Sequence, residues 1–304
     1  MARRWWEWWR RCVTSHGLSI RNAALKFMMV HRTPPPYEPH SLGDGSAFLE
    51  TKLISLAGCP CAGQNRRHMK RILLPFFCLL IVSTSNAQEA ARSKALLPEP
   101  RPDQMQRHES FNEISKKGEA QIVFLGDSIT QGWGGAGRDV WAKTWEPMKS
   151  ANFGIGGDRT EHVLWRLENG NYDGLKPKLT VLMIGTNNTG HRMDPAADTV
   201  AGVKAIVEKL RAKQPQMKIL VLGVFPRGEK ADDPMRIRTN EINALLPNLA
   251  DEKVVFYKDI SKTFLQSDGI LSKDIMPDSL HLSPKGYELW AAAIESNVKE
   301  LIAK

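Results

Sequence analysis

The segment QIVFLGDSITQGWGG, residues 121–135, begins as a strand that is apolar at every position and ends as a loop of small and polar residues. The run Ile122-Val123-Phe124-Leu125 is typical of a strand that is buried on both faces of a sheet. It stops abruptly at Gly126-Asp127-Ser128. Ser128 is therefore either the cap of a following helix or a nucleophile held at the end of a strand.

The sequence after residue 107 alternates buried strands with helices. Further apolar runs lie at 150–154, 179–185, 218–225 and 253–257, and helical spacing occurs at 107–117, 160–169, 196–213, 235–250 and 284–302. Pro284 suits a first helical turn, with Ser283 as its N-cap. Apolar strands that alternate with helices indicate a parallel sheet covered on both faces. We predict one doubly wound, flavodoxin-like α/β/α sandwich of about five parallel strands over residues 108–304.

Residues 69–87 have the features of a secretory signal peptide. Lys70 and Arg71 precede an apolar run at 72–82, and the small residues Ser85-Asn86-Ala87 stand where a signal peptidase cleaves. The apolar run is too short to span a bilayer comfortably. We therefore expect an exported protein, periplasmic or extracellular, with no stable membrane span after cleavage. An uncleaved segment that tethers the chain to a membrane is the alternative.

The remainder of the front region adds charge without a recognisable fold. Residues 1–68 show no sustained helical or strand period, so we interpret them as a non-native or disordered extension upstream of a true start at Met69. A Trp- and Arg-rich arm that lies on a membrane surface is the alternative. Residues 88–107 are polar and contain three prolines, which predicts a linker.

Charge and cysteine usage restrict the function classes. Residues 1–87 hold 12 of the 42 basic residues and 4 of the 33 acidic residues, so most of the net charge of +9 lies there. Beyond residue 87 no basic stripe with interleaved aromatic residues occurs, and we expect no nucleic-acid partner. All four cysteines precede residue 88 as well, so the predicted domain uses neither a disulfide nor a thiolate-bound metal; they are Cys12, Cys59, Cys61 and Cys78.

Residues that could take part in catalysis or binding follow the predicted strands. The first strand leads into Gly126-Asp127-Ser128-Ile129, the second into Asn152-Phe153-Gly154-Ile155-Gly156-Gly157-Asp158 and the third into Gly185-Thr186-Asn187-Asn188, while Asp278-Ser279-Leu280-His281 precedes the last helix. The carboxyl ends of parallel strands meet at one edge of a sheet, where ligands bind. A serine needs a base to take its proton, and an aspartate can orient that base. Ser128, His281 and Asp278 are therefore the candidate nucleophile, base and orienting carboxylate.

These four blocks, in this order, resemble the GDSL or SGNH hydrolases. The segment NFGIGGDRTEHVLWRLENG, together with GTNN, is more narrowly similar to the catalytic subunits of intracellular platelet-activating factor acetylhydrolase. The resemblance covers roughly residues 108–302 and implies the SGNH hydrolase fold. It also implies an oxyanion hole made by the N–H groups of Ser128 and Gly156 and the side-chain amide of Asn187. The look-alike subunits are dimers, so a homodimer is an expectation.

One position departs from the broad family pattern. Family members usually have Asp after the third-block asparagine, and this chain has Asn188. The acetylhydrolase-like branch also carries Asn there, so we interpret Asn188 as a mark of that branch.

Several alternatives stay open beside this interpretation. Ser128 could merely cap a helix, and His281 could be an ordinary loop histidine. The resemblance gives Asp127 a structural hydrogen-bonding role. The spacing of Gly154, Gly156 and Gly157 matches neither a dinucleotide-binding loop nor a P-loop, and no His, Asp or Glu cluster has metal-ligand spacing, so we expect neither a cofactor nor a metal.

We expect a serine esterase that acts on short acyl esters. Ile129, Thr186 and Leu280 flank the candidate catalytic groups and have enough bulk to narrow an acyl pocket, which favours acetyl. The export signal favours an acetylated sugar or polysaccharide as the substrate. A lysophospholipase- or thioesterase-type enzyme, or a lipid esterase like platelet-activating factor acetylhydrolase, is the alternative. A member without catalysis, which only binds an acylated glycan or a partner, is the less favoured one.

Overall fold

A five-stranded, all-parallel sheet forms the centre of the computed structural model, which describes residues 93–303. Its strand order is β2-β1-β3-β4-β5, and Phe124 at the middle of β1 pairs with Asn152 on β2 and Val181 on β3. This order is flavodoxin-like and confirms the predicted doubly wound α/β fold. The strands are β1 (Ile122–Gly126), β2 (Ser150–Gly154), β3 (Leu179–Met183), β4 (Lys218–Leu222) and β5 (Val255–Lys258).

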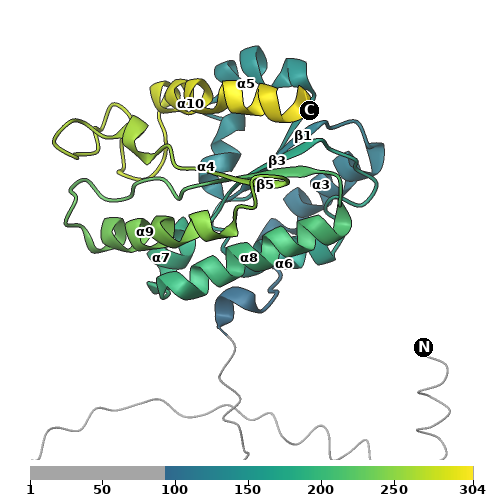
Figure 1. The fold of residues 1–304 in the computed structure, drawn as a ribbon, viewed down its shortest axis with the longest axis horizontal. Helices are drawn as coiled ribbons and strands as arrows, with labels where there is room; N and C mark the ends of the chain where they lie inside the picture. The colour runs from purple at the N-terminus through teal and green to yellow at the C-terminus, as the bar shows by residue number, and fades with distance from the viewer. Residues whose placement is uncertain (1–92, 304) are drawn as a thin grey trace, which may run out of the picture. The chain divides into compact units, whose positions relative to one another are not determined.

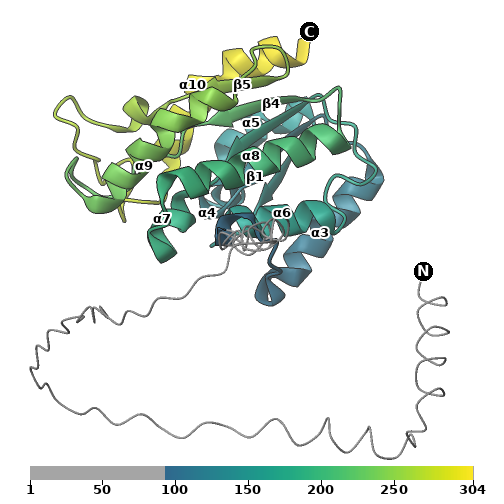
Figure 2. The ribbon, with the colours of Figure 1, turned by 60° about the horizontal axis from the view of Figure 1, so that its bottom comes forward.

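Helices cover both faces of the sheet. Figure 1 shows α5 and α10 on one face and α6, α8 and α9 on the other, and Figure 2 shows α3 beside α6 on this second face. The α-helices are α3 (Met105–Lys117), α4 (Ser128–Gln131), α5 (Arg138–Thr144), α6 (Thr160–Glu168), α7 (Thr186–Arg192), α8 (Ala196–Lys213), α9 (Pro234–Leu245) and α10 (Pro284–Ala303). Short 3-10 turns are η1 (Lys94–Leu96), η2 (Pro102–Gln104), η3 (Gly132–Gly134), η4 (Glu146–Met148), η5 (Leu246–Leu249) and η6 (Ser261–Phe264).

The predicted helix at 235–250 is shorter than expected as an α-helix. It ends at Leu245 and continues as the 3-10 turn η5, which contains Pro247. A proline has no N–H to donate and disfavours the α conformation of the residue before it, so the last turn changes its geometry. The helices α5 and α7 were not predicted, because seven residues are too few to show a helical period clearly.

The side chains of β1 alternate between two apolar cores. Val123 and Leu125 pack into the core under α6 and α8, whereas Ile122 and Phe124 pack into the core under α10. The α10 core is rich in aromatic rings that have almost no exposed surface; they include Trp133, Trp145, Tyr287 and Trp290. The Tyr287 hydroxyl also donates to the Ile129 carbonyl oxygen at 2.6 Å, which ties α10 to the turn that carries Ser128.

The described part of the predicted linker is packed against the domain. Ala95 is fully buried, and its carbonyl oxygen accepts a hydrogen bond from the Thr160 hydroxyl at 2.9 Å. The Glu99 N–H donates to the Glu161 carbonyl oxygen at 3.3 Å. These contacts use backbone groups, which a polar and proline-containing composition does not reveal. Residues 93–104 therefore dock at the start of α6 and do not hang free as a linker would.

The predictions for residues 1–68 and for the signal peptide at 69–87 lie outside the described residues. Within 93–303, no helix combines the length and the apolar character that a membrane crossing requires.

Candidate active site

The end of β1 explains why the apolar run stops at Gly126. A Cβ atom at Gly126 would overlap with the Thr130 side chain and the Met183 carbonyl oxygen, so only glycine lets the chain fold back here. Asp127 then caps α4, because its Oδ1 accepts from the Ile129 N–H at 3.0 Å. Asp127 is therefore the N-cap of α4, and the Ser128 hydroxyl is not used for capping.

Ser128 and His281 meet across 153 positions of sequence. The Ser128 Oγ lies 2.9 Å from His281 Nε2, and His281 Nδ1 lies 2.7 Å from Asp278 Oδ2. An ionised carboxylate only accepts hydrogen bonds, so this arrangement places the imidazole proton on Nδ1 and leaves Nε2 to accept from the serine. The order nucleophile, base and carboxylate is the one that acyl-transfer chemistry requires.

A tight loop delivers both His281 and Asp278. The Asp278 Oδ1 accepts from the backbone N–H groups of Leu280 at 3.0 Å and His281 at 2.7 Å, so the carboxylate folds its own loop. Burial raises the pKa of Asp278, but the hydrogen bonds from His281 outweigh it and bring the pKa below its ordinary value. Asp278 is thus ionised at neutral pH, as an orienting carboxylate must be.

The site is open to solvent. The side chains of His281 and Asp278 are 46% and 55% exposed, and Ser128 is half-buried. A substrate can reach the serine and the histidine with no movement of a covering segment.

Two of the expected oxyanion donors, Ser128 and Gly156, lie side by side, but the Gly156 N–H is engaged. Gly156 lies beside Ser128, since a Cβ built at Gly156 would be 3.8 Å from the Ser128 Cβ. Its N–H donates to the Gln131 Oε1 at 2.7 Å. The Asn187 Nδ2 donates one hydrogen to the Asp158 carbonyl oxygen at 2.9 Å, which leaves its second hydrogen for another acceptor.

Gln131 was not singled out in the sequence, although a signal for it exists. It lies three residues after Ser128, and side chains three apart in a helix lie on one face. A helical turn predicted after the serine therefore directs attention to the side chain at Gln131.

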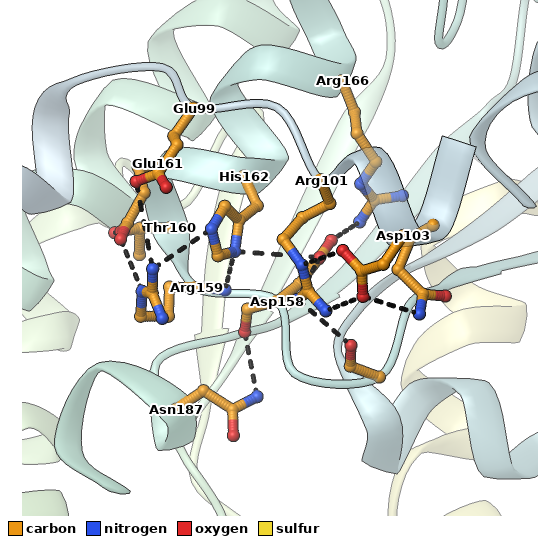
Figure 3. Close-up of polar contacts among 12 residues, drawn as sticks. Glu99, Arg101, Asp103, Asp158, Arg159, Thr160, Glu161, His162, Arg166 and Asn187 are labelled. Atoms are coloured by element: carbon orange, nitrogen blue, oxygen red, sulfur yellow. Dashed lines mark hydrogen bonds and ion pairs between the residues drawn. The ribbon is translucent and has the colours of Figure 1, made fainter. Parts of the chain in front are cut away.

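A buried ion network supports the loop that carries Gly156 (Figure 3). Asp158 is fully buried, and its Oδ2 lies 3.0 Å from Nη2 of Arg166, which is also buried. The Arg101 Nη1 lies 3.7 Å from Asp158 Oδ1 and donates to the Gly156 carbonyl oxygen at 3.4 Å. Even so, burial raises the pKa of Asp158 to about 6. The ion pairs of the Asp158 side chain therefore hold this residue in place, and its carbonyl oxygen accepts the hydrogen bond from the Asn187 amide.

Asn188 has a contact set that needs an amide. It is fully buried, its Oδ1 accepts from the Thr160 N–H at 3.1 Å, and its Nδ2 donates to the Thr160 hydroxyl at 3.2 Å and to Asp194 Oδ2 at 3.0 Å. An aspartate could not donate to either of these acceptors. Asn188 therefore departs from the broad family pattern at a position where its amide donates a hydrogen bond to Asp194.

The structure does not bring the three expected acyl-pocket residues to a common surface. Ile129 and Thr186 are 1% and 0% exposed, so neither offers a side-chain surface to a substrate. Leu280 is half-buried and packs against the core that includes Ile129. Bulk beside a catalytic residue in sequence does not place a side chain in the pocket, because it turns inward wherever the core has room for it.

One cluster within 93–303 has the composition of a metal site, and it was not predicted from spacing. Ligand atoms of Glu99, Glu161 and His162 lie within 4.8 Å of one another. However, the Glu161 Oε1 accepts from Arg159 at 2.6 Å and Arg192 at 2.5 Å, and the His162 Nδ1 accepts from the Arg159 N–H at 3.0 Å. The two guanidinium groups already supply the positive charge that a cation would bring.

Comparisons with known proteins identify the family to which the sequence is similar. The model of the GDSL-like Lipase/Acylhydrolase family matches residues 124–289. The chain is 39% identical over 201 residues to platelet-activating factor acetylhydrolase IB subunit alpha1 of Homo sapiens. This alignment covers 66% of this chain and 84% of the relative. It is 38% identical over 202 residues to the alpha2 subunit of Rattus norvegicus, which covers 65% of this chain and 84% of that subunit.

Solved structures show the same fold. The crystal structure of a GDSL-like lipase from Bacteroides thetaiotaomicron superposes with a TM-score of 0.53 at 20% identity, covering 64% of this chain and 97% of the lipase. The family match and the two relatives confirm the resemblance that the four sequence blocks predicted. The chain therefore belongs to the GDSL-like lipase/acylhydrolase family, and it is a hydrolase that acts on ester bonds.

Proposed function

We propose that the protein is a serine esterase that removes short acyl groups, acetyl above all, with Ser128 as the nucleophile, His281 as the base and Asp278 as the orienting carboxylate. The observation that carries this proposal is the unbroken series of contacts from Ser128 Oγ through His281 to Asp278, at 2.9 and 2.7 Å. A helix cap or a loop histidine needs no such series. The same contacts speak against a member that only binds, because binding does not require a nucleophile next to a base.

Each residue has a defined part in the reaction. His281 Nε2 takes the Ser128 proton as Oγ attacks the ester carbonyl, and Asp278 stabilises the imidazolium that results. His281 then returns the proton to the departing alcohol oxygen, which leaves an acyl-serine. A water molecule, activated by the same Nε2, hydrolyses that acyl-serine and restores Ser128.

The oxyanion of the tetrahedral intermediate has three candidate donors in this proposal. The Ser128 N–H begins α4, where first-turn N–H groups have no intrahelical partner. The second hydrogen of Asn187 Nδ2 is the next donor. The Gly156 N–H becomes the third once it exchanges its bond with Gln131 for one with the oxyanion. Each such donor contributes about 10²–10³ in rate.

Two features support different alcohol parts of the substrate. The export signal expected at 69–87 favours an acetylated sugar or polysaccharide outside the cytoplasm, and we propose that substrate class and that location. The relatives at 38–39% identity carry the name acetylhydrolase, which supports acetyl as the acyl group, and platelet-activating factor in the same name favours a lipid ester as the second candidate.

The test compares p-nitrophenyl acetate, butyrate and octanoate as substrates for the full chain and for Ser128→Ala. We expect acetate to have the highest kcat/KM and Ser128→Ala to fall below about 10⁻³ of the parent. Ser110→Ala, on the exposed surface of α3, is the matched control and should keep the parent rate. Higher rates on octanoate would contradict the acetyl preference, and full activity in Ser128→Ala would contradict the serine mechanism.

A second measurement then separates the substrate classes. Release of acetate from acetylated xylooligosaccharides is compared with release from a 2-acetyl glycerophospholipid at equal concentration. A rate that is at least tenfold higher on the sugar ester supports the first candidate, and the reverse ratio supports the lipid ester.

A further inference from the structure

Arg227 lies beside the candidate active site and has no part in the mechanism above. It belongs to the loop between β4 and α9, and its Nη1 donates to the Thr186 carbonyl oxygen at 3.0 Å. Thr186 begins α7 and immediately precedes Asn187, an expected oxyanion donor. The half-buried guanidinium also packs against Gly190, where a Cβ would collide with it. Arg227 thus contacts α7 both at its first residue and in its last turn.

The backbone of Arg227 is held to the catalytic loop. The buried Arg236 donates from Nε to the Arg227 carbonyl oxygen at 3.1 Å and from Nη2 to the Gly228 carbonyl oxygen at 2.5 Å. The Gly228 N–H donates to the carbonyl oxygen of Ser279, the residue after Asp278, at 3.0 Å. Arg227 therefore connects the loop that carries His281 with the helix that carries Asn187.

The charge of Arg227 is not neutralised as those of its neighbours are. Arg101, Arg159 and Arg192 each lie within 2.7 Å of a carboxylate oxygen, and Figure 3 shows the first two of these contacts. In the described part of the chain, no carboxylate lies within 4.0 Å of Arg227, and its Nε and Nη2 form no hydrogen bond there. An arginine stays charged in proteins, so two donor nitrogens of the planar fork, Nε and Nη2, remain for an anion.

More distant carboxylates do not use these donors. Burial lowers the pKa of Arg227, and the opposing influence comes from Asp127, Asp233 and Asp278 beyond contact distance. Asp127 caps α4 through Oδ1, Asp233 caps α9 and Asp278 holds His281, and none of these three carboxylates lies within 4.0 Å of the guanidinium. A guanidinium that is partly desolvated and short of a partner binds an anion more strongly than one in bulk water.

We propose that Arg227 binds an anionic group, a carboxylate or a phosphate, on the alcohol part of the ester substrate. An acetyl group carries no charge, so the anion has to belong to the departing alcohol. This inference rests on the proposed esterase function and narrows its substrate class to acidic esters, such as an acetylated uronic acid or sugar phosphate.

The test uses two esters that share the acetyl group and the ring but differ in the charge of the para substituent, and it compares their rate ratio in parent and variant. 4-Acetoxybenzoate and its methyl ester carry the same acetyl group on the same ring, and kcat/KM is measured on both for the full chain and for Arg227→Gln. We expect Arg227→Gln to lower the ratio of the anionic to the neutral rate about tenfold and to change the rate on the methyl ester less than threefold. Arg138→Gln, an exposed arginine on α5, is the control and should leave the ratio unchanged. 4-Acetoxyphenyl phosphate, run beside these esters, distinguishes phosphate from carboxylate.

Two results would overturn the proposal. An equal fall on both esters would show that Arg227 only maintains the loop, and unchanged rates on both esters would show that it does not contact the substrate. In either case hydrolysis of the methyl ester by the parent would leave the proposed esterase function intact.

A binding measurement makes the test independent of turnover. In the Ser128→Ala background, calorimetry compares the Kd of 4-acetoxybenzoate with that of its methyl ester. Tighter binding of the anion, lost in Ser128→Ala/Arg227→Gln, supports the proposal even if the natural ester differs from these probes. Equal Kd values for the two ligands contradict it.

Discussion

A short polar residue at the end of a strand can either cap the following helix or direct its side chain to the candidate active site. In this protein Asp127 does the first and Ser128 does the second. Asp127 accepts the N–H of Ile129, the second residue of α4, with its buried carboxylate, whereas the Ser128 hydroxyl contacts His281. The burial of Asp127 is possible because Gly126 and Gly154 let α4 pack directly on the ends of the strands; a Cβ at either position would collide with α4. The turn therefore presents the serine outward and the aspartate inward.

Gln131 is expected to compete with the substrate for the Gly156 N–H. Gln131→Ala removes the acceptor that holds this donor at 2.7 Å, so the oxyanion no longer has to displace it. A neutral hydrogen bond contributes about 1 kcal/mol net, and kcat on p-nitrophenyl acetate should rise up to about fivefold. Steady-state kinetics check this. A tenfold fall would mean instead that Gln131 keeps the Gly156 loop in its working position.

Asn188→Asp is expected to destabilise the protein strongly. It restores the residue usual in the broad family, but here it places a carboxylate against Asp194 and removes the donor to the Thr160 hydroxyl. An uncompensated buried charge costs about 3 kcal/mol, so the urea midpoint should fall accordingly. Asn240→Asp, on the exposed face of α9, is the matched control. A midpoint equal to that of the parent would show that the network accepts a second carboxylate.

At the scale of the element, α10 links the loop that carries Asp278 and His281 to the core. It begins three residues after His281, and Trp290, Ile294 and Val298 bury its inner face under the sheet. Ser283 holds its start, because its Oγ accepts from the Gly286 N–H at 3.2 Å and donates to the Asp274 carbonyl oxygen at 2.5 Å. The position of His281 thus depends on where this helix begins.

Ser283→Ala is expected to loosen that start. Loss of an N-cap costs about 1 kcal/mol of stability, and the displaced helix start should lower kcat/KM as well. Asp233→Ala removes the corresponding cap of α9 and serves as the comparison, with a similar loss of stability. Thermal unfolding and p-nitrophenyl acetate kinetics are measured for both variants. Equal activity in parent and Ser283→Ala would show that His281 is fixed by its own loop alone.

At the scale of the whole molecule, burial of Asp127 should make the stability depend on pH. Burial raises the pKa of Asp127 to about 7, while the Ile129 N–H opposes the shift. The folded pKa lies above the unfolded one, so this group contributes stability that is complete below about pH 4 and is lost as pH rises through about 7. The contribution is on the order of 4 kcal/mol.

Asp127→Asn tests this dependence. Asparagine is a good N-cap and keeps an acceptor for the Ile129 N–H, but it has no proton to lose. We expect the parent to gain stability from pH 8 to pH 5 and the variant to gain much less, as measured by urea unfolding at both pH values. Asp139→Asn, at a 96% exposed side chain on α5, should retain the parent's slope. An identical slope in Asp127→Asn would contradict the assignment.

Much of this architecture was predictable because the signals are local. The apolar runs place all five strands, and the 3.6-residue period places α6, α8 and α10, since each pattern repeats within a window of the chain. The blocks around Ser128, Asn187 and His281 were predictable for the same reason: each is contiguous and directly follows a strand or precedes a helix. Alternation of strand and helix then implies that these blocks meet at one edge of the sheet.

What only the tertiary structure decided concerns how side chains turn once the elements pack. The sequence determined that Ser128, His281 and Asp278 belong to one edge, whereas packing decided that Ile129 and Thr186 point into the core and that Gln131 holds the Gly156 N–H. Packing also docked residues 93–104 on α6 and left Arg227 without a carboxylate partner. The physical reason is that backbone pattern is a property of neighbours in the chain, while burial and pairing depend on groups that approach from distant segments.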